Sequence, residues 1–126
     1  MTEYHSNNHC KYLLKYHVVL VCKFRKPLLI KLGDYVKSII VNYCSKQRWV
    51  LVAVETDRNH IHLMLDLPPD IKVSDVIMLL KQHSTYEVKN LNSYLPKGKL
   101  WSSGSFICTT GDASAETIKR YINNQG

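Results

Sequence analysis

The hydrophobic positions along the chain follow two different periods, and the changes between them predict the order of the elements. Residues 12–24, YLLKYHVVLVCKF, are rich in β-branched and aromatic side chains and poor in charge, which predicts a long interior strand that ends before Pro27. WVLVAVET, at 49–56, is a second apolar run of strand length. HIHLMLDL, at 60–67, alternates as a third strand, and the tight RN connection at 58–59 predicts an antiparallel hairpin.

Two longer segments, 31–47 and 73–91, repeat their apolar residues at steps of three and four, the period of an amphipathic helix. Residues 100–111, LWSSGSFICTTG, predict a strand or a short hairpin, and Asp112 and Ser114 are candidate caps for a helix that follows. The first six elements then run strand, helix, strand, strand, helix, strand. This is the order of a ferredoxin-like (RRM-like) α+β fold, an antiparallel sheet with two helices on one face. A third, C-terminal helix is left over.

Composition narrows the class of partner. The 126 residues have the length of one domain, which we expect to span 1–126, with 1–10 flexible and the last helix within 112–126. A net charge of +7 favours a polyanion such as nucleic acid, although an acidic membrane surface fits the charge equally well. With no apolar run of about 18 residues and no signal peptide, we expect a soluble cytoplasmic protein. Four widely spaced cysteines without a CxxC pair predict reduced, buried thiols.

The third predicted strand carries polar side chains where aliphatic ones would cost nothing. In a strand, His60 and His62 point to one face, while the intervening Ile61 and Leu63 point to the core. The two imidazoles are then about 7 Å apart, a spacing from which both can bind one metal ion. Taken alone, the pattern equally describes two histidines on a solvated sheet face.

The C-terminal helix adds residues that extend this chemistry. Tyr121 and Gln125 are four residues apart on one helical face, which is exposed if Ile118 and Ile122 face the protein, although such a pair also occurs by chance. Two neutral imidazoles and one amide oxygen would form a site suited to Mg²⁺ or Mn²⁺ with positions left open for substrate oxygens. Such a cation polarises a phosphodiester while an adjacent tyrosine attacks phosphorus.

Together these motifs resemble the single-tyrosine (TnpA-like) transposases of the His-hydrophobic-His, or HUH, nuclease superfamily, encoded by simple bacterial and archaeal insertion sequences. The resemblance spans nearly the whole chain through YLLKYHVVLVCKFRKPLL, HIHLML, LWSSGSF and IKRYINNQ, in that order. It implies that His60 and His62 are metal ligands, Tyr121 is the nucleophile and Gln125 is the third ligand. Relatives cut single-stranded DNA at transposon ends through a 5′-phosphotyrosine link and rejoin it with the freed 3′-hydroxyl, so no nucleotide cofactor is implied.

The resemblance also implies partners: DNA hairpins near the element ends, and a homodimer in which the tyrosine helix of one subunit can complete the other's site. In this chain the segment TTGDAS before the last helix could allow that reach, with Gly111 as the expected hinge. One departure from the family is Asn59, which stands where relatives often have Asp. In this chain the expected DNA contacts are cations and aromatic rings, although each lysine is equally read as a solvated surface charge. They are Lys23, Arg25, Lys26, Lys97, Lys99 and, for base stacking, Trp101 or Tyr94.

Two other functions fit the same residues. One is a non-catalytic nucleic-acid-binding ferredoxin-like module, which the lack of an aromatic RNP-like block disfavours. The other is a related HUH nicking enzyme or a domesticated relative, which shares the cleavage step. His17 and His83 are read as structural or as DNA contacts, and the group His5, His9 and Cys10 as part of the flexible N-terminus.

Overall fold

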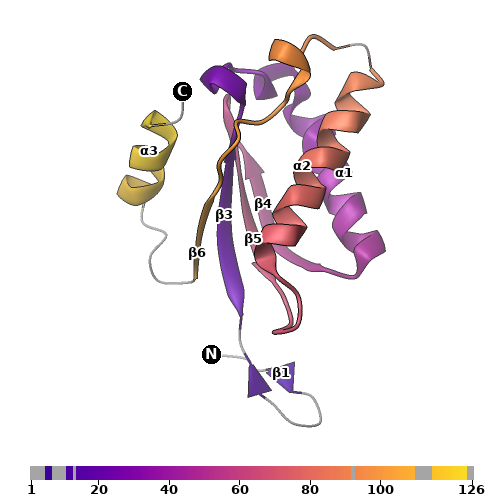
Figure 1. Ribbon diagram of the computed structural model, residues 1–126, viewed down its shortest axis with the longest axis vertical. Coiled ribbons are helices and arrows are strands. Elements are labelled where there is room, and N and C mark those ends of the chain that lie inside the picture. The colour runs from indigo at the N-terminus through magenta and orange to yellow at the C-terminus, as the bar shows by residue number, and fades with distance from the viewer. Residues whose placement is uncertain (1–4, 7–10, 13, 92, 110–114, 125–126) are drawn as a thin grey trace.

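A four-stranded antiparallel sheet forms the centre of the molecule (Figure 1). The structure, a computed structural model, describes residues 5–6, 11–12, 14–91, 93–109 and 115–124. The sheet has the order β4-β5-β3-β6, and every neighbouring pair is antiparallel. Its strands are β3 (Lys15–Val21), β4 (Val50–Thr56), β5 (His60–Asp66) and β6 (Phe106–Thr109).

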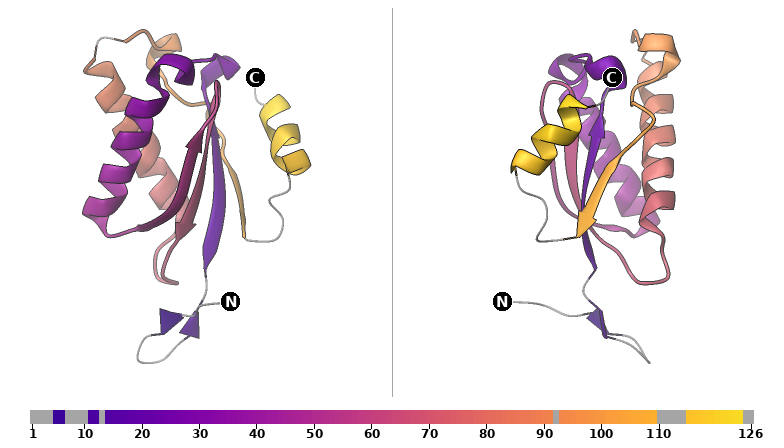
Figure 2. Two further views of the ribbon diagram at one scale, coloured as in Figure 1. Left: turned by 180° about the vertical axis from the view of Figure 1, so that it is seen from behind. Right: turned by 60° about the vertical axis from the view of Figure 1, so that its left-hand side comes forward.

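The helices lie on both faces of this sheet. The pair formed by α1 (Leu29–Gln47) and α2 (Val73–Lys89) covers one face, and α3 (Ala115–Asn123) lies on the other, as the left view of Figure 2 shows. The strand order and the position of the first two helices are those of the ferredoxin-like fold. The predicted fold class is therefore confirmed.

The main core lies between the sheet and the helix pair. Alternate residues of β5 point into it, and Ile61, Leu63 and Leu65 are fully buried there. Val18 and Leu20 of β3 belong to the same core, as do residues of both helices such as Val36 and Leu80. The alternation of apolar and polar residues predicted for 60–67 is thus matched by alternating burial along β5.

The opposite face of β3 is buried as well. Val19 and Val21 have no exposed surface, yet in the strand register they lie opposite His62 and His60, on the face away from α1 and α2. A strand buried on both faces reads as a continuous apolar run, which is why this segment showed no alternation. The centre of the histidine face is therefore covered rather than open to solvent.

The first predicted strand differs from the prediction. The long strand expected at 12–24 is divided, because Lys11–Tyr12 forms β2 and the chain leaves the sheet after Val21. Within the segment expected to be flexible, His5–Ser6 forms β1 and pairs with β2, and the flexibility of that segment stays a prediction. His9 and Cys10 lie outside the described residues.

Short irregular segments close the end of the sheet where β3 finishes. Lys23–Arg25 forms a 3-10 turn, η1, in which Phe24 and Arg25 have φ of 58° and 53°, and Pro96–Gly98 forms a second one, η2. Trp101 then pairs with Cys22 in an isolated bridge before β6 begins. The described residues 100–109 thus contain one strand rather than a hairpin, and the prediction had left both open.

Two expectations from composition can be compared with the described residues. None of the helices in the described part of the chain is long and apolar enough to cross a membrane. Cys22 and Cys44 are free and buried, as expected, and burial raises the pKa of the Cys44 thiol to about 11. Cys108 is half-buried.

Candidate active site

His60 and His62 lie on the face of β5 that points away from α1 and α2, as predicted, and both are half-buried. Burial lowers the pKa of His60, and the nearby Asp57 carboxylate partly opposes this shift. Burial also lowers the pKa of His62, assisted by the neighbouring His17 imidazole and opposed by Glu55. Both imidazoles are therefore neutral at pH 7, the state in which a ring nitrogen can bind a metal.

Asn59 fixes the orientation of the first imidazole. His60 Nδ1 lies 3.0 Å from Asn59 Oδ1, so an Nδ1–H group donates to the amide oxygen and the lone pair of the ring is on Nε2. The departure noted in the sequence thus keeps the hydrogen-bond acceptor that an aspartate would supply and removes its charge.

His17, which the sequence analysis left open as structural or as a DNA contact, is hydrogen-bonded to His62. Its Nδ1 lies 3.1 Å from Nε2 of His62, and the two ring centroids are 5.3 Å apart. One of the two nitrogens carries the hydrogen and the other accepts it. His17 lies opposite Met64 in the β3–β5 register, which makes it a diagonal neighbour of His62 on the same face. Only the register brings the two histidines together, and the sequence carries no direct signal for it.

Tyr121 is turned toward the sheet. Its ring centroid lies 5.5 Å from that of Phe106, which is paired with Val19, and Val19 is in turn paired with His62. Phe106 and His62 therefore share one face and one row of the sheet, with their backbones about 10 Å apart across two strand spacings. The tyrosine ring contacts the same sheet face that carries the histidines.

The hydroxyl group of Tyr121 is buried and has no hydrogen-bond partner among the described residues. Burial raises the pKa of this phenol. The expected exposure of Tyr121 was conditional on which helical face meets the protein, and in the structure α3 folds back with the Tyr121 ring against Phe106 of β6. Gln125, the predicted third ligand, lies outside the described residues.

Arg25 joins α3 to the body of the protein. Its Nη1 donates to the backbone oxygen of Asn123, 3.1 Å away, in the last turn of the helix. A cation in this position also interacts favourably with the negative end of the helix dipole. The structure thus gives Arg25 an internal partner, where the sequence predicted a phosphate contact.

The predicted DNA contacts fall into different environments. Phe24 is 43% exposed, and the ammonium groups of Lys23 and Lys97 lie 5.0 and 5.6 Å from its ring centroid. Trp101 is 4% exposed, and its Nε1–H donates to Ser84 Oγ, 2.9 Å away, inside the protein. Stacking of a base on Trp101 is therefore contradicted, because the ring is a core side chain.

The other predicted contacts reach the surface: Lys26 and Lys99 are exposed, and Tyr94 is 72% exposed. Their binding to DNA stays a prediction.

The residues present fit a divalent cation held by few protein ligands. Within the described part of the chain, no cluster of three or more His, Cys, Asp or Glu side chains could hold a metal. Two neutral imidazoles facing one way, completed by a ligand of another type, are compatible with this observation. They suit a catalytic rather than a closed structural metal site.

Comparisons with known proteins agree with one another. The family model described as "Transposase IS200 like" matches residues 10–125. The ISDra2 transposase TnpA of Deinococcus radiodurans is 26% identical over 119 residues, which cover 90% of this chain and 85% of that protein. The transposase for insertion sequence element IS200 of Salmonella typhimurium is 29% identical over 122 residues, which cover 93% and 80%.

Solved structures extend this agreement to the fold. A putative transposase from Deinococcus radiodurans superposes with a TM-score of 0.86 at 26% identity, covering 96% of this chain and 97% of that one. A REP-associated tyrosine transposase bound to a REP hairpin gives a TM-score of 0.60 at 15% identity, covering 98% and 69%, and shows the likeness of the fold alone. Because the family model matches nearly all of it, the chain belongs to the IS200-like transposase family.

Proposed function

We propose that this transposase cleaves and rejoins single-stranded DNA, with Tyr121 as the nucleophile and with a divalent cation, Mg²⁺ or Mn²⁺, held by His60 and His62. One observation carries the proposal: on the sheet face that presents the imidazoles, the phenol hydroxyl is buried and has no hydrogen-bond partner among the residues that the structure describes. Buried polar groups are nearly always paired, and an unpaired one needs an explanation. A scissile phosphate at this place would supply the missing acceptor.

The chemical step conserves one ester bond. Tyr121 Oη attacks the phosphorus of a DNA phosphodiester, the bond between phosphorus and the 3′-oxygen breaks, and the phenol proton leaves as the 3′-oxygen gains one. The product is a 5′-phosphotyrosine and a free 3′-hydroxyl, and rejoining is the reverse attack by a 3′-hydroxyl. Since the ester energy is kept in the phosphotyrosine, the reaction needs no nucleotide cofactor.

The side chains of the site prepare this step. His60 and His62 stay neutral because burial lowers their pKa values, and Asn59 keeps the proton of His60 on Nδ1. A bound divalent cation would stabilise the negative charge that develops on the phosphate oxygens and favour ionisation of a phenol beside it. Burial raises the pKa of Tyr121, so the resting site holds the phenol protonated. Gln125 is the proposed third ligand, by the family resemblance.

For the DNA, we propose hairpins near the ends of the element, bound by a homodimer in which Tyr121 can act on its own or the partner's site. Phosphates would meet the cations at the end of the sheet where β3 finishes. Arg25 is left out of this count, because its guanidinium donates to Asn123 O. If the other four proposed cations bind phosphates, log Kd should change with log salt concentration with a slope of magnitude roughly 2.8. Those four are Lys23, Lys26, Lys97 and Lys99.

The test is formation of a covalent protein–DNA adduct that survives a denaturing gel, with a hairpin oligonucleotide and Mg²⁺ or Mn²⁺. Tyr121→Phe should abolish the adduct and retain DNA binding, and Tyr86→Phe, at an exposed tyrosine of α2, is the matched control. His62→Ala should abolish metal-dependent cleavage, with His83→Ala as its control, since the ring of His83 stacks on Tyr43 away from the site. An adduct formed by Tyr121→Phe would refute the nucleophile, and full activity of His62→Ala would refute the metal site.

A further inference from the structure

Phe24 presents an aromatic ring to solvent at the end of the sheet where β3 finishes. Its side chain is 43% exposed, although phenylalanine is among the residues most often buried. Single exposed apolar side chains are common, so exposure alone assigns no role to the ring. Its backbone conformation, its charged neighbours and its position beside the proposed site together indicate a binding role.

The backbone keeps this ring at the surface in an uncommon conformation. Phe24 and Arg25 have φ of 58° and 53°, in the left-handed region that bulky side chains rarely adopt. Arg25 N donates to Cys22 O at 2.9 Å, which closes the turn and fixes this conformation. Backbone strain of this kind is concentrated at ligand-binding sites, and a side chain that is already fixed loses little entropy when a ligand binds.

Two cations lie beside the ring. Lys23 Nζ and Lys97 Nζ are 5.0 and 5.6 Å from its centroid, within the range of a cation–π interaction. An exposed ring beside two ammonium groups complements a nucleotide, because the base can stack on the ring while the flanking phosphates contact the cations.

The turn that carries Phe24 is hydrogen-bonded to both parts of the proposed site. On one side, Cys22 N donates at 2.8 Å to the backbone oxygen of the residue that precedes His60. On the other side, the Arg25 guanidinium donates at 3.1 Å to the last turn of α3, the helix that carries Tyr121. A DNA strand with its scissile phosphate at the site therefore passes this turn with an adjoining nucleotide.

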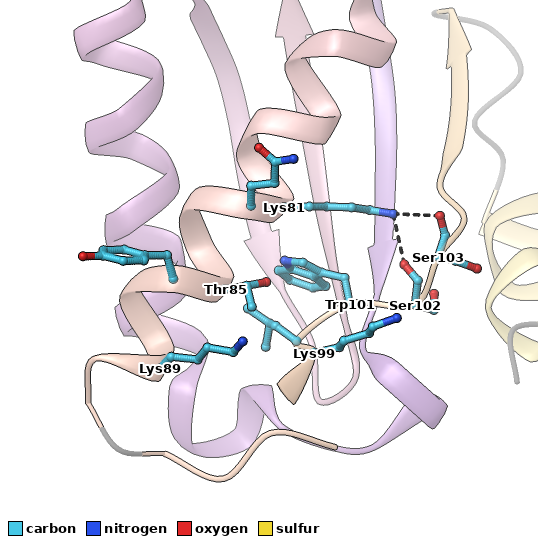
Figure 3. Close-up of a pocket in the computed structure, with 10 residues that line it drawn as sticks. Lys81, Thr85, Lys89, Lys99, Trp101, Ser102 and Ser103 are labelled. Carbon is cyan, nitrogen blue, oxygen red and sulfur yellow. Dashed lines mark hydrogen bonds between the residues drawn. The ribbon is translucent and has the colours of Figure 1, made fainter. Parts of the chain in front are cut away.

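The neighbouring aromatic ring, Trp101, cannot take this role. Its backbone pairs with Cys22, but its side chain lines a pocket between α2 and the segment that precedes β6, where Figure 3 shows it beside Thr85. Trp101 is 4% exposed and donates to Ser84 Oγ inside the protein. Of the two aromatic rings on the paired segments 22–24 and 100–101, only that of Phe24 is open to a base.

We propose that Phe24 stacks on one nucleobase of the single strand next to the cleaved bond, with Lys23 and Lys97 contacting the phosphates that flank it. The inference rests on the proposed function, because it takes single-stranded DNA as the substrate. Every base has a π face, so the contact holds the strand without reading its sequence. Phe24 thereby keeps the scissile phosphate in register with Tyr121 and the imidazoles.

Binding of a fluorescent hairpin oligonucleotide with a single-stranded extension tests the proposal, with every protein in the Tyr121→Phe background so that cleavage does not interfere. Phe24→Ala should weaken binding by about fivefold or more and leave the slope of log Kd against log salt unchanged, because a stacked ring releases no counterions. Lys23→Ala and Lys97→Ala should instead each reduce the magnitude of this slope by about 0.7. Tyr86→Ala, at an exposed aromatic residue of α2, is the control and should change neither quantity.

Two further variants separate stacking from packing. Phe24→Leu keeps an apolar side chain of similar size but has no π face, so it should lose as much affinity as Phe24→Ala. Phe24→Trp keeps a stacking ring and should retain the affinity of the Tyr121→Phe parent. Hydrogen exchange of α3 should be the same in Phe24→Leu as in the parent, which shows that the loss of affinity does not come from undocking of the tyrosine helix.

A last measurement locates the stacked base. Oligonucleotides with one abasic site moved along the extension should bind the Tyr121→Phe parent poorly when the gap falls at one position, and Phe24→Leu should lose this sensitivity. Phe24 variants that bind like Tyr86→Ala, a lower salt slope in Phe24→Leu, or an abasic profile that Phe24→Leu leaves unchanged would overturn the inference and leave the proposed function standing. Failure of the unsubstituted chain to bind single-stranded DNA would overturn both.

Discussion

Removal of the Arg25 side chain should loosen α3. The guanidinium donates to Asn123 O at 3.1 Å, which links η1 to the last turn of α3. Hydrogen bonds from charged donors contribute about 1.5–3 kcal/mol when well formed, and a cation at a helix C-terminus about 0.3–1 kcal/mol. Because this hydrogen bond is exposed to solvent, we expect its loss to cost about 1 kcal/mol of docking free energy. This corresponds to about a fivefold fall in the equilibrium constant for docking α3.

Hydrogen exchange measured by mass spectrometry reports this docking without depending on catalysis. Peptides that cover α3 should exchange up to about fivefold faster in Arg25→Ala, and Arg25→Lys should recover part of the protection. Lys26→Ala removes the same charge from the neighbouring residue and should leave exchange unchanged. The rate of adduct formation should fall in parallel in Arg25→Ala. Equal exchange in Arg25→Ala and Lys26→Ala would refute the assignment of Arg25 as a positioning residue for the tyrosine helix.

Three further outcomes follow from the site and its support. His17→Ala should tighten Mn²⁺ binding by about twofold to tenfold in calorimetry, because the metal then no longer competes with the hydrogen bond at His62 Nε2; weaker binding would instead make His17 a ligand. The free energy of unfolding without metal should fall as the pH drops below 6.5, since the unfolded chain takes up protons that folded His60 and His62 resist; a variant with Gln at both positions should lose part of this dependence in urea titrations at pH 7.5 and 5.5. Ser84→Ala should cost about 1–3 kcal/mol in urea unfolding, because Trp101 Nε1–H is left buried without an acceptor, and the added substitution Trp101→Phe should reduce that cost.

The sequence predicted those features that depend on local period. Alternation at 60–67 placed His60 and His62 on one face, and the order of strands and helices led to the sheet topology. These inferences need no knowledge of distant contacts, because a strand or helix shows its buried face in its own spacing.

The features that were missed depend on contacts between distant segments. His17 and His62 are 45 positions apart, and their hydrogen bond follows from the strand register. Trp101 follows a loop rich in Lys and Gly and was therefore expected at the surface, yet Ser84 of α2 offers it a buried acceptor. Tyr121 was expected to be exposed if Ile118 and Ile122 face the protein, and the period of a short helix does not settle which of its faces packs on the sheet. Contacts between strands, and the packing of α3 on the sheet, form only when the whole sheet has assembled, so local spacing does not predict them.

Docking of α3 buries the hydroxyl of Tyr121, for which the described part of the chain offers no hydrogen-bond partner, and DNA should relieve this cost. A buried hydroxyl without a partner costs about 1–3 kcal/mol, and the contacts of α3 with Phe106 and Arg25 oppose this cost. A substrate phosphate that accepts from the hydroxyl would remove the cost, so DNA binding and helix docking should strengthen each other. Tyr121→Phe deletes the unpaired group but keeps the ring, and without DNA its α3 should exchange more slowly than in the unsubstituted chain. Added hairpin DNA should slow exchange of α3 in the unsubstituted chain more than in Tyr121→Phe. Equal protection of the two proteins, with and without DNA, would mean that the hydroxyl has no energetic role in docking, and the argument that it awaits a phosphate would fail.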